Sequence, residues 1–386
     1  MPSLTEQHSL YDIPFNKPWL SGNEYRYVAQ AVEGGHISGD GPFTRRCSQM
    51  LEEWTGAARV LLTTSCTHAL EMCALLLDLK PGDEVILPSF TFVSTVNAFA
   101  LRGATPVFAD IHPETLNLDE TRLERLVTAR TRAIVPVHYA GIGCEMVAIM
   151  EIAHQHNLQV VEDNAHGLLG RYKDRLLGSF GCLATQSFHE TKNFTCGEGG
   201  ALVINDPQLI EPAEILREKG TNRSRFFRGQ VDKYTWVGLG SSYLPSDILS
   251  AFLLAQLEAH ERIQTRRKNI WETYLTELQS WAESIGARLP IVPSHCQPSY
   301  HLFYVLMPDL STRQGLIEHL KERRILAVFH YQPLHLSTMG QCYGGRPGDC
   351  PVTEDIADRL VRLPFYNGLS EVEQSRVIDA VQSFIP

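Results

Sequence analysis

Short apolar, β-branched runs recur through the first half of the chain and are separated by stretches with helical spacing. The strand-like runs cover residues 60–62, 84–87, 106–109, 133–137, 160–161 and 201–204. Strands separated by helices of this length predict a mainly parallel sheet with helices covering both faces. We therefore expect an α/β fold whose sheet forms a large domain.

The second half of the chain has a different pattern. Residues 246–283 contain few helix breakers and place apolar side chains at helical spacing, with Ser246 able to cap the start. An apolar run at 300–306, a helix at 312–323, a run at 326–330 and a closing helix at 371–384 then predict an α+β unit. We expect an N-terminal arm and large domain over 1–245, then one long connecting helix and a smaller C-terminal domain over 246–386.

Several side chains with binding or catalytic potential follow the predicted strands. Thr67, Phe92, Asp163 and the segment leading to Lys192 all come after strand-like runs. Ligands of α/β sheets bind at the carboxyl ends of the strands, so positions far apart in the sequence can meet there. The pattern predicts one site built from these residues.

Lys192 and Asp163 suggest the chemistry of this site. Lys192 has the Ser187 hydroxyl five residues before it and glycines soon after it, as expected for a lysine directed at a bound aldehyde cofactor. A carboxylate at the end of a buried strand can keep a pyridine nitrogen protonated, as pyridoxal phosphate (PLP) requires. Taken singly, a lysine is more often a solvated surface charge, and an aspartate after a strand is more often a helix N-cap or part of a loop ion pair.

Further residues are candidates for holding the cofactor. Thr67 lies at a predicted helix N-terminus, where free N–H groups and the helix dipole favour phosphate, and Ser187 offers a second hydroxyl. Phe92 can stack on the pyridine ring, and His166 can hydrogen-bond its phenolic oxygen. Taken singly, Thr67 is also consistent with helix capping, Phe92 with core packing and His166 with a satisfied buried histidine.

Composition excludes some classes of protein. The formal net charge is −10, which argues against a broad nucleic-acid-binding surface. The N-terminus lacks a basic stretch followed by an apolar core, and no apolar run is long enough for a membrane span, so we expect a cytosolic protein. The nine scattered cysteines favour reduced thiols, and we expect no metal site.

These residues together resemble a known family. From Ile13 to the C-terminus, the chain is similar to the DegT/StrS group of sugar-nucleotide aminotransferases of PLP fold type I. The motifs that carry the resemblance are Ser65-Cys-Thr67, Pro88-Ser-Phe-Thr-Phe92, Pro136-Val-His-Tyr139, Glu162-Asp-Asn-Ala-His166, Ser187-Phe-His-Glu-Thr-Lys192, Gly197-Glu-Gly-Gly200 and His330-Tyr-Gln-Pro-Leu-His335.

The resemblance assigns roles to individual residues. It implies that Lys192 forms the Schiff base with PLP and that Asp163 meets the ring nitrogen. It also implies that Phe92 stacks on the ring and that Thr67 and Ser187 bind the phosphate. Cys66, within the first motif, joins the cofactor-binding set, and the family implies a homodimer with active sites at the subunit interface.

A narrower resemblance concerns the substrate. The segments 39–46, 218–224, 226–236 and 328–331 look like those of the branch that makes dTDP-4-amino-4,6-dideoxygalactose. This implies dTDP-4-keto-6-deoxyglucose as acceptor and L-glutamate as donor, with 2-oxoglutarate as the second product. The residues that we expect to contact substrate are Asp40, His138, Arg228, Lys233, Tyr234, His330 and Tyr331.

The chain departs from the family pattern at one place. Much of the family has Asn-Tyr-Arg before the long helix, where the asparagine reaches the cofactor phosphate of the neighbouring subunit, but here Ser242 occupies the matching position and the arginine is absent. We expect Ser242 to make the contact instead. Open alternatives are amination with gluco stereochemistry, amination at C3, or a PLP-binding regulator without turnover. A PLP-dependent sugar dehydratase is disfavoured, because such relatives replace the lysine by histidine.

Overall fold

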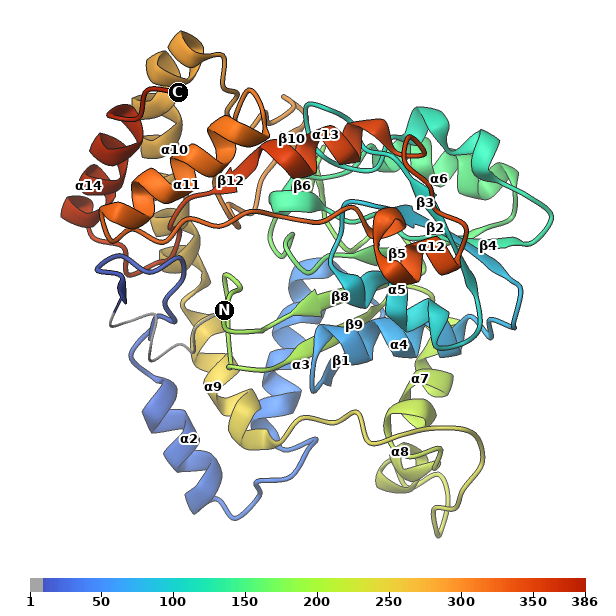
Figure 1. Ribbon diagram of the computed structural model, residues 1–386. Helices are drawn as coiled ribbons and strands as arrows, with labels where there is room; N and C mark the ends of the chain where they lie inside the picture. Colours follow the sequence, from blue (N-terminus) through green and yellow to red (C-terminus); the bar gives the residue numbers. More distant parts are fainter. Residues whose placement is uncertain (1–9) are drawn as a thin grey trace.

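The computed structural model describes residues 10–386, and its centre is a seven-stranded sheet (Figure 1). The strand order is β1-β9-β8-β5-β4-β2-β3. All strands run parallel except β9, which is antiparallel to both neighbours. The bounds are β1 Arg59–Thr63, β2 Glu84–Pro88, β3 Thr105–Ala109, β4 Thr131–Ile134, β5 Gln159–Asp163, β8 Leu183–Ser187 and β9 Gly200–Ile204. The predicted α/β fold is confirmed.

Alternate residues of each strand face opposite helical layers, because side chains alternate along a strand. Val161, Leu183 and Leu202 share one core with helices on the first face, whereas Val160 and Ala184 face the other side. The first layer contains α4 Cys66–Leu76, α5 Val93–Ala100 and α7 Ile210–Arg217. The second contains α3 Pro42–Thr55, α6 Met146–Gln155 and α9 Asp247–Glu258. Both faces of the sheet are therefore buried.

A second unit is built around its own hydrophobic core, seen at the upper left of Figure 1. Its elements are α10 His260–Ile285, β11 Tyr304–Leu306, α11 Leu310–Glu322, β12 Leu360–Arg362 and α14 Glu371–Gln382. Helix α13 Pro351–Arg359 packs in a neighbouring cluster that also contains residues of the large unit. Ile13 of the N-terminal segment belongs to this core. The helix predicted at 312–323 begins slightly earlier, behind a capping box formed by Asp309 and Thr312.

The single long helix predicted from residue 246 is in fact two helices. Ser246 caps α9 as expected, its hydroxyl accepting a hydrogen bond from the Leu249 N–H. Helix α9 ends at Glu258, and Ala259 leaves helical geometry before α10 begins. The two helices face different surroundings, since α9 packs with α2 Glu24–Glu33 and α3 in the large unit. The domain boundary after residue 245 stays a prediction.

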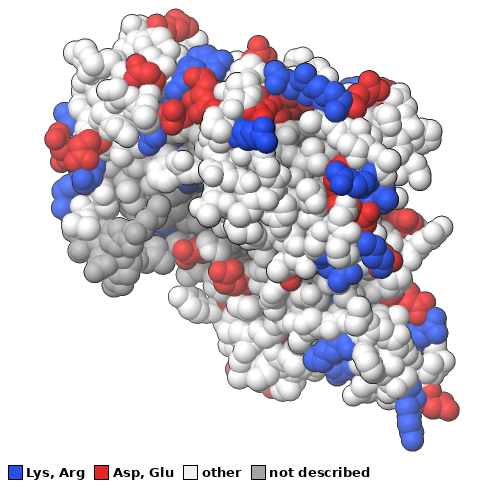
Figure 2. Space-filling model, turned by 45° about the vertical axis from the view of Figure 1, so that its right-hand side comes forward, with Lys and Arg blue, Asp and Glu red and all other residues white. Residues whose placement is uncertain are grey.

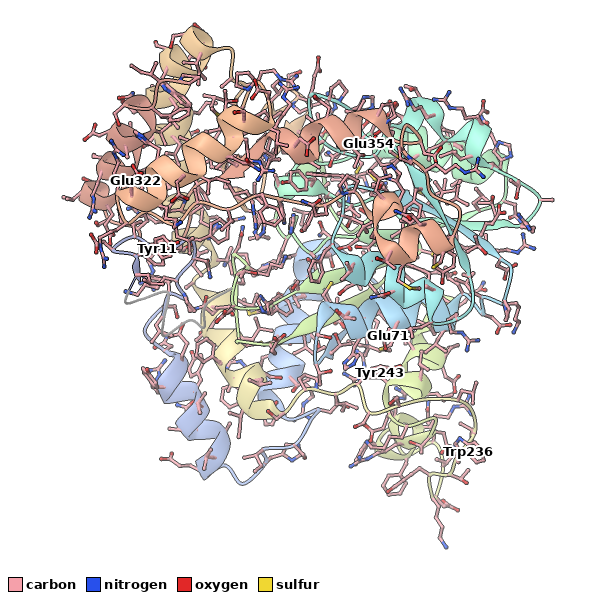
Figure 3. The ribbon with its side chains drawn as sticks, in the orientation of Figure 1. Tyr11, Glu71, Trp236, Tyr243, Glu322 and Glu354 are labelled. Atoms are coloured by element: carbon pink, nitrogen blue, oxygen red, sulfur yellow. The ribbon has the colours of Figure 1, made fainter. Side chains whose placement is uncertain are left out.

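The remaining elements are short and peripheral. They are β6 Arg171–Tyr172, β7 Arg175–Leu176, α8 Arg223–Phe227, β10 Cys296–Gln297 and α12 Thr338–Cys342. The segment around α8 extends from the lower end of the molecule in Figure 1, and Trp236 lies on this extension in Figure 3.

Charged side chains and the apolar character of the helices describe the surface of the molecule. On the face drawn in Figure 2, basic and acidic side chains are interspersed. Within residues 10–386, no helix combines the length and apolar character that a bilayer crossing needs.

Candidate active site

One edge of the large sheet gathers the predicted site residues. Strands β1, β5 and β8 end there at Thr63, Asp163 and Ser187, and the reversed strand β9 starts there at Gly200. Gly200 pairs with both Thr63 and Ser187. The loop that carries Lys192 thus leaves and re-enters the sheet at this edge. The ends of these strands thus meet at one edge of the sheet, and the role of this edge as a site stays a prediction.

Asp163 is buried and held in a fixed orientation. Thr95 Oγ1 donates a hydrogen bond to Asp163 Oδ2 at 2.7 Å, and the Ala165 N–H donates to Oδ1 at 3.1 Å. Thr95, on α5, is also buried and contacts the Thr91 hydroxyl. Asp163 has the same strand parity as Val161, so it faces the α4 and α5 layer. This carboxylate is oriented by donors yet has no cationic partner in a salt bridge among the described residues.

Lys192 is partly buried in the loop after β8, and its backbone N–H donates to the His189 carbonyl. Burial lowers the pKa of the Lys192 ammonium to about 8 and the Arg362 charge adds to this, while the neighbouring Cys66 and the Asp163 carboxylate oppose it. The lysine therefore has a substantial neutral fraction near physiological pH, which nucleophilic attack on an aldehyde requires.

The N-terminus of α4 lies beside this lysine. Ser65 caps the helix, with its Oγ accepting from the His68 N–H at 3.1 Å, and Thr67 Oγ1 donates to Ser94 Oγ at 2.8 Å. A Cβ on Gly200 would overlap the backbone of Ser65 and Cys66. Glycine is thus required for β9 to start against the helix N-terminus. Burial and the Asp163 charge raise the pKa of the Cys66 thiol to about 12, so this thiol stays neutral.

Three histidines form a stacked column above the site. The ring of His166 lies 4.1 Å from that of His301 and 6.3 Å from that of His330, and both pairs are nearly parallel. Asn193 Oδ1 contacts His301 Nδ1 at 2.9 Å, and the Tyr139 hydroxyl contacts His330 Nδ1 at 2.9 Å. Burial lowers the pKa of each histidine, so the column is neutral. His166 Nδ1 is buried without a hydrogen-bond partner.

Phe92 and Tyr331 lie on opposite units but close together. Phe92 precedes α5 and is 57% exposed, so its ring is not a core residue. The Tyr331 ring lies 6.4 Å from it. The exposed aromatic face of Phe92 is available to a planar ligand, which agrees with the predicted ring stacking.

The position of His138 does not support its predicted contact with substrate. The side chain is fully buried, its Nε2 lies 2.9 Å from Glu162 Oε2, and its Nδ1 accepts from the Cys144 N–H at 3.2 Å. Both ring nitrogens are therefore engaged. Glu162 has the opposite strand parity to Asp163, so this pair lies behind the sheet and away from the site.

The other predicted substrate residues occupy different places. His330 and Tyr331 belong to the site cluster. Arg217 Nη2 donates to both carboxylate oxygens of Asp40, at 2.6 and 2.8 Å. Arg228 pairs with Glu214, and Lys233 and Tyr234 are exposed on the extension after α8, together with Ser242 beyond it.

Sequence reasoning missed three residues of the cluster. Thr95 and His301 lie outside the motifs from which the sequence assigns roles. Arg362 belongs to β12, and its charge acts on Lys192 and on all three histidines of the column. Only the fold brings these positions together.

The arrangement suits PLP. The unpaired His166 Nδ1 is free to hydrogen-bond a phenolic oxygen, and the oriented Asp163 carboxylate can meet a protonated ring nitrogen. The α4 N-terminus and the Ser187 hydroxyl offer donors to a phosphate. Lys192, with its lowered pKa, supplies the amine. Each functional group of the cofactor thus has a chemically matching partner.

Comparisons with known proteins identify the family of the chain. The model of the DegT/DnrJ/EryC1/StrS aminotransferase family matches residues 19–382. The spore coat polysaccharide biosynthesis protein SpsC of Bacillus subtilis (strain 168) is 34% identical, with 97% of each chain covered.

Solved structures of aminotransferases are also similar to this chain. The aminotransferase TlmJ from Streptoalloteichus hindustanus is 31% identical with a TM-score of 0.88, covering 96% of this chain and 98% of that one. Spr1654 from Streptococcus pneumoniae, a candidate sugar aminotransferase solved in a PLP form, is 26% identical with a TM-score of 0.88 over 97% of this chain and 98% of its own. The chain belongs to the DegT/DnrJ/EryC1/StrS family and is a PLP-dependent sugar aminotransferase.

Proposed function

We propose that this enzyme transfers the amino group of L-glutamate to C4 of dTDP-4-keto-6-deoxyglucose. The products are dTDP-4-amino-4,6-dideoxygalactose and 2-oxoglutarate. The observation that best supports aminotransferase chemistry is the lowered pKa of Lys192, about 8. The oriented Asp163 carboxylate lies within electrostatic range of this lysine. The acceptor is supported by the likeness of segments 218–224 and 226–236 to the branch that makes this amino sugar.

The cofactor, when bound, would supply the electron sink that lets an amino acid lose its Cα proton. Lys192 Nζ would hold the cofactor, and its amine would move the proton at the donor Cα. Asp163 would face the ring nitrogen and favour its protonated form, and His166 would hydrogen-bond the phenolic oxygen. Phe92 would stack on the ring, and Thr67 and Ser187, with the neighbouring Cys66, would line the phosphate site.

We further propose that the enzyme acts as a homodimer with its active sites at the subunit interface. The extension that follows α8 is exposed in the single chain, and it carries the predicted substrate residues Arg228, Lys233 and Tyr234. Ser242 is likewise exposed. In a dimer, these residues would reach the active site of the partner subunit, where Ser242 would contact the cofactor phosphate.

The decisive experiment offers the purified holoenzyme dTDP-4-keto-6-deoxyglucose and L-glutamate. We expect an amino sugar whose C4 nitrogen has galacto stereochemistry by NMR, with equimolar 2-oxoglutarate. An equatorial C4 amine would support the gluco alternative, and amination of the 3-keto isomer alone would refute the assigned position. Cofactor binding without turnover on any keto sugar would favour the regulator.

Two variants serve as controls for the catalytic roles. Lys192→Ala should lose the absorbance of the lysine-bound cofactor and its turnover. Asp163→Ala should retain part of the cofactor but transaminate at least 100-fold more slowly, roughly the loss expected when a charged electrostatic partner is removed. Turnover equal to the parent in either variant would remove that residue from the mechanism.

A further inference from the structure

Asn193 connects the lysine loop to the segment 299–301. It follows Lys192 directly in the chain, and it is buried, with 8% of its surface exposed. Asn193 Nδ2 donates a hydrogen bond to the Ser299 carbonyl at 2.7 Å, and its Oδ1 lies 2.9 Å from His301 Nδ1. Both partners are more than a hundred residues away in the sequence. The residue next to the lysine is therefore held by a segment that only the fold brings near.

The two contacts of Asn193 determine which ring nitrogen of His301 carries a proton. The Ser299 carbonyl can only accept a hydrogen bond, so the amide nitrogen of Asn193 faces it and Oδ1 faces His301. Because Oδ1 also only accepts, His301 Nδ1 is the protonated nitrogen. Burial is the main cause of the lowered pKa of His301, and the charges of nearby cationic side chains act in the same direction, so the ring is neutral. Its Nε2 is therefore unprotonated.

His301 and its neighbour Ser299 in turn hold His166. The rings of His301 and His166 lie 4.1 Å apart, with 25° between their planes. The Ser299 hydroxyl donates to the His166 carbonyl, and a Cβ on Gly141 would overlap this hydroxyl. His166 Nδ1 has no hydrogen-bond partner in the part of the chain that the structure describes. The orientation of this free nitrogen thus depends on the segment 299–301.

Arg267 fixes the backbone of the same segment. This residue of α10 is 3% exposed, and its Nε donates to the Tyr300 carbonyl at 2.8 Å. Its Nη2 donates to the His301 carbonyl, and its Nη1 donates to Asn367 Oδ1 at 3.0 Å. Tyr300 has a φ of +54°, a left-handed conformation that costs free energy for a residue with a side chain. The segment therefore keeps a conformation that its surroundings impose.

We propose that Asn193 and His301 are positioning residues, whose shared hydrogen bond fixes the lysine loop and the His166 ring relative to each other. The inference rests on the proposed hydrogen bond from His166 to the phenolic oxygen of the cofactor. A donor to this oxygen stabilises its ionised form, so it lowers the pH at which the lysine-bound cofactor loses its proton. Loss of the contact between Asn193 and His301 frees the His301 ring to turn, and the stacked His166 loses its orientation.

The first test follows the absorbance of the PLP-loaded enzyme as a function of pH, without substrate. Asn193→Ala and His301→Phe each remove the shared hydrogen bond, and His301→Phe keeps an aromatic ring for stacking. We expect each variant to raise the midpoint of the absorbance titration by about one pH unit, the shift that corresponds to one charge-assisted hydrogen bond. The double variant should show the shift of one single variant rather than the sum, because both changes remove the same contact.

The second test needs no cofactor. Nitrogen NMR of the histidine-labelled apoprotein reports which ring nitrogen is protonated, and the His301 signals are those that His301→Phe lacks. We expect the Nδ1-protonated form in the wild type and a mixture of both neutral forms in Asn193→Ala. Asn205→Ala is the matched control and should leave both readouts unchanged. Asn205 also donates to two backbone carbonyls, but it follows β9 at the opposite edge of the sheet.

Three results would overturn the proposal: an unchanged midpoint in both single variants, additive shifts in the double variant, or unchanged protonation of His301 in Asn193→Ala. Neither readout uses a keto sugar or an amino donor, so an error in the proposed transamination leaves both interpretable. His166→Phe separates the two proposals. An unchanged midpoint in that variant would refute the proposed role of His166, and the NMR result would then decide the positioning of His301. If Asn193→Ala does not fold, the midpoint of His301→Phe decides.

Discussion

At the residue scale, the state of Lys192 is set by opposing influences. Burial favours the neutral amine, Arg362 acts in the same direction, and the Asp163 charge favours the ammonium. With a pKa of about 8, about one tenth of the lysine is neutral at pH 7, whereas an ordinary lysine is almost wholly charged. Lys192 can therefore react with an aldehyde without a separate base to deprotonate it.

We predict a characteristic pH dependence for cofactor capture by the apoprotein. The rate constant for reaction with PLP should rise about tenfold per pH unit below pH 8 and level off above it, because only the neutral amine reacts. Stopped-flow absorbance measures this rate. In Asp163→Asn, the midpoint should move to lower pH, since the charge that favours the ammonium is removed.

A lysine amide in solution, measured in parallel, corrects for titration of PLP itself. A rate for the protein that continues to climb through pH 9.5, as for the free lysine derivative, would contradict the lowered pKa of Lys192.

The residues that sequence could assign are those whose local context is informative. Lys192, Asp163 and Thr67 follow strands, and the carboxyl edge of a sheet brings such positions together. His138 also follows a strand, but it lies behind the sheet, and only the observed hydrogen bonds to Glu162 and Cys144 reveal this. The sequence could not assign Arg362 to the site, because its effect on the pKa of Lys192 depends on tertiary packing.

At the element scale, the contact between β9 and α4 shapes the phosphate site. Gly200 lets the first residue of the strand press against the backbone at the helix N-terminus, where Ser65 caps the helix. Any side chain at this position would push the helix start away from the sheet edge. The free N–H groups that face the ligand would move with it.

Gly200→Ala should therefore lower both stability and cofactor affinity. Overpacking of this kind costs roughly 1–3 kcal/mol, which urea unfolding of the apoprotein would register, and PLP affinity should fall because α4 shifts. The matched control is Gly238→Ala, where an added Cβ meets nothing nearer than 3.6 Å. Equal stability and equal PLP affinity for the two variants would contradict the close packing described here.

The elements themselves were largely predictable, and the exception has a physical reason. The strand runs and the Ser246 cap were read from periodicity and cap chemistry. The break at Ala259 could not be predicted, because alanine is a good helix former and gives no signal that a helix ends. Most of α10 packs in a different hydrophobic core from α9, whereas Ile263 near its start shares the core of α9.

At the scale of the whole molecule, α8 and the extension that follows it expose several large apolar side chains. Phe227, Trp236 and Leu239 are 69%, 75% and 72% exposed in the single chain, and Figure 3 shows Trp236 far from the sheet. A cluster of exposed large apolar side chains on a chain of net charge −10 is typical of a protein interface. This agrees with the proposed homodimer.

We expect sedimentation equilibrium to give twice the mass of the chain, and Trp236→Asp to shift the species toward the monomer and to lower turnover. A buried charge at an interface without a partner weakens association strongly. Val372→Asp is the control, because Val372 is 81% exposed but lies on α14 in the smaller unit. A wild-type monomer, or equal dimerisation of both variants, would contradict the interface.

The reversed direction of β9 has a consequence for how the protein folds. Because β8 and β9 are antiparallel neighbours, the loop bearing Lys192 closes a local hairpin, whereas Asp163 joins the same edge only through parallel pairings between distant segments. Local pairings close faster than non-local ones, since less chain entropy is lost before contacts form. We therefore expect the hairpin that carries Lys192 to form early in folding, before Asp163 takes its position at the same edge of the sheet.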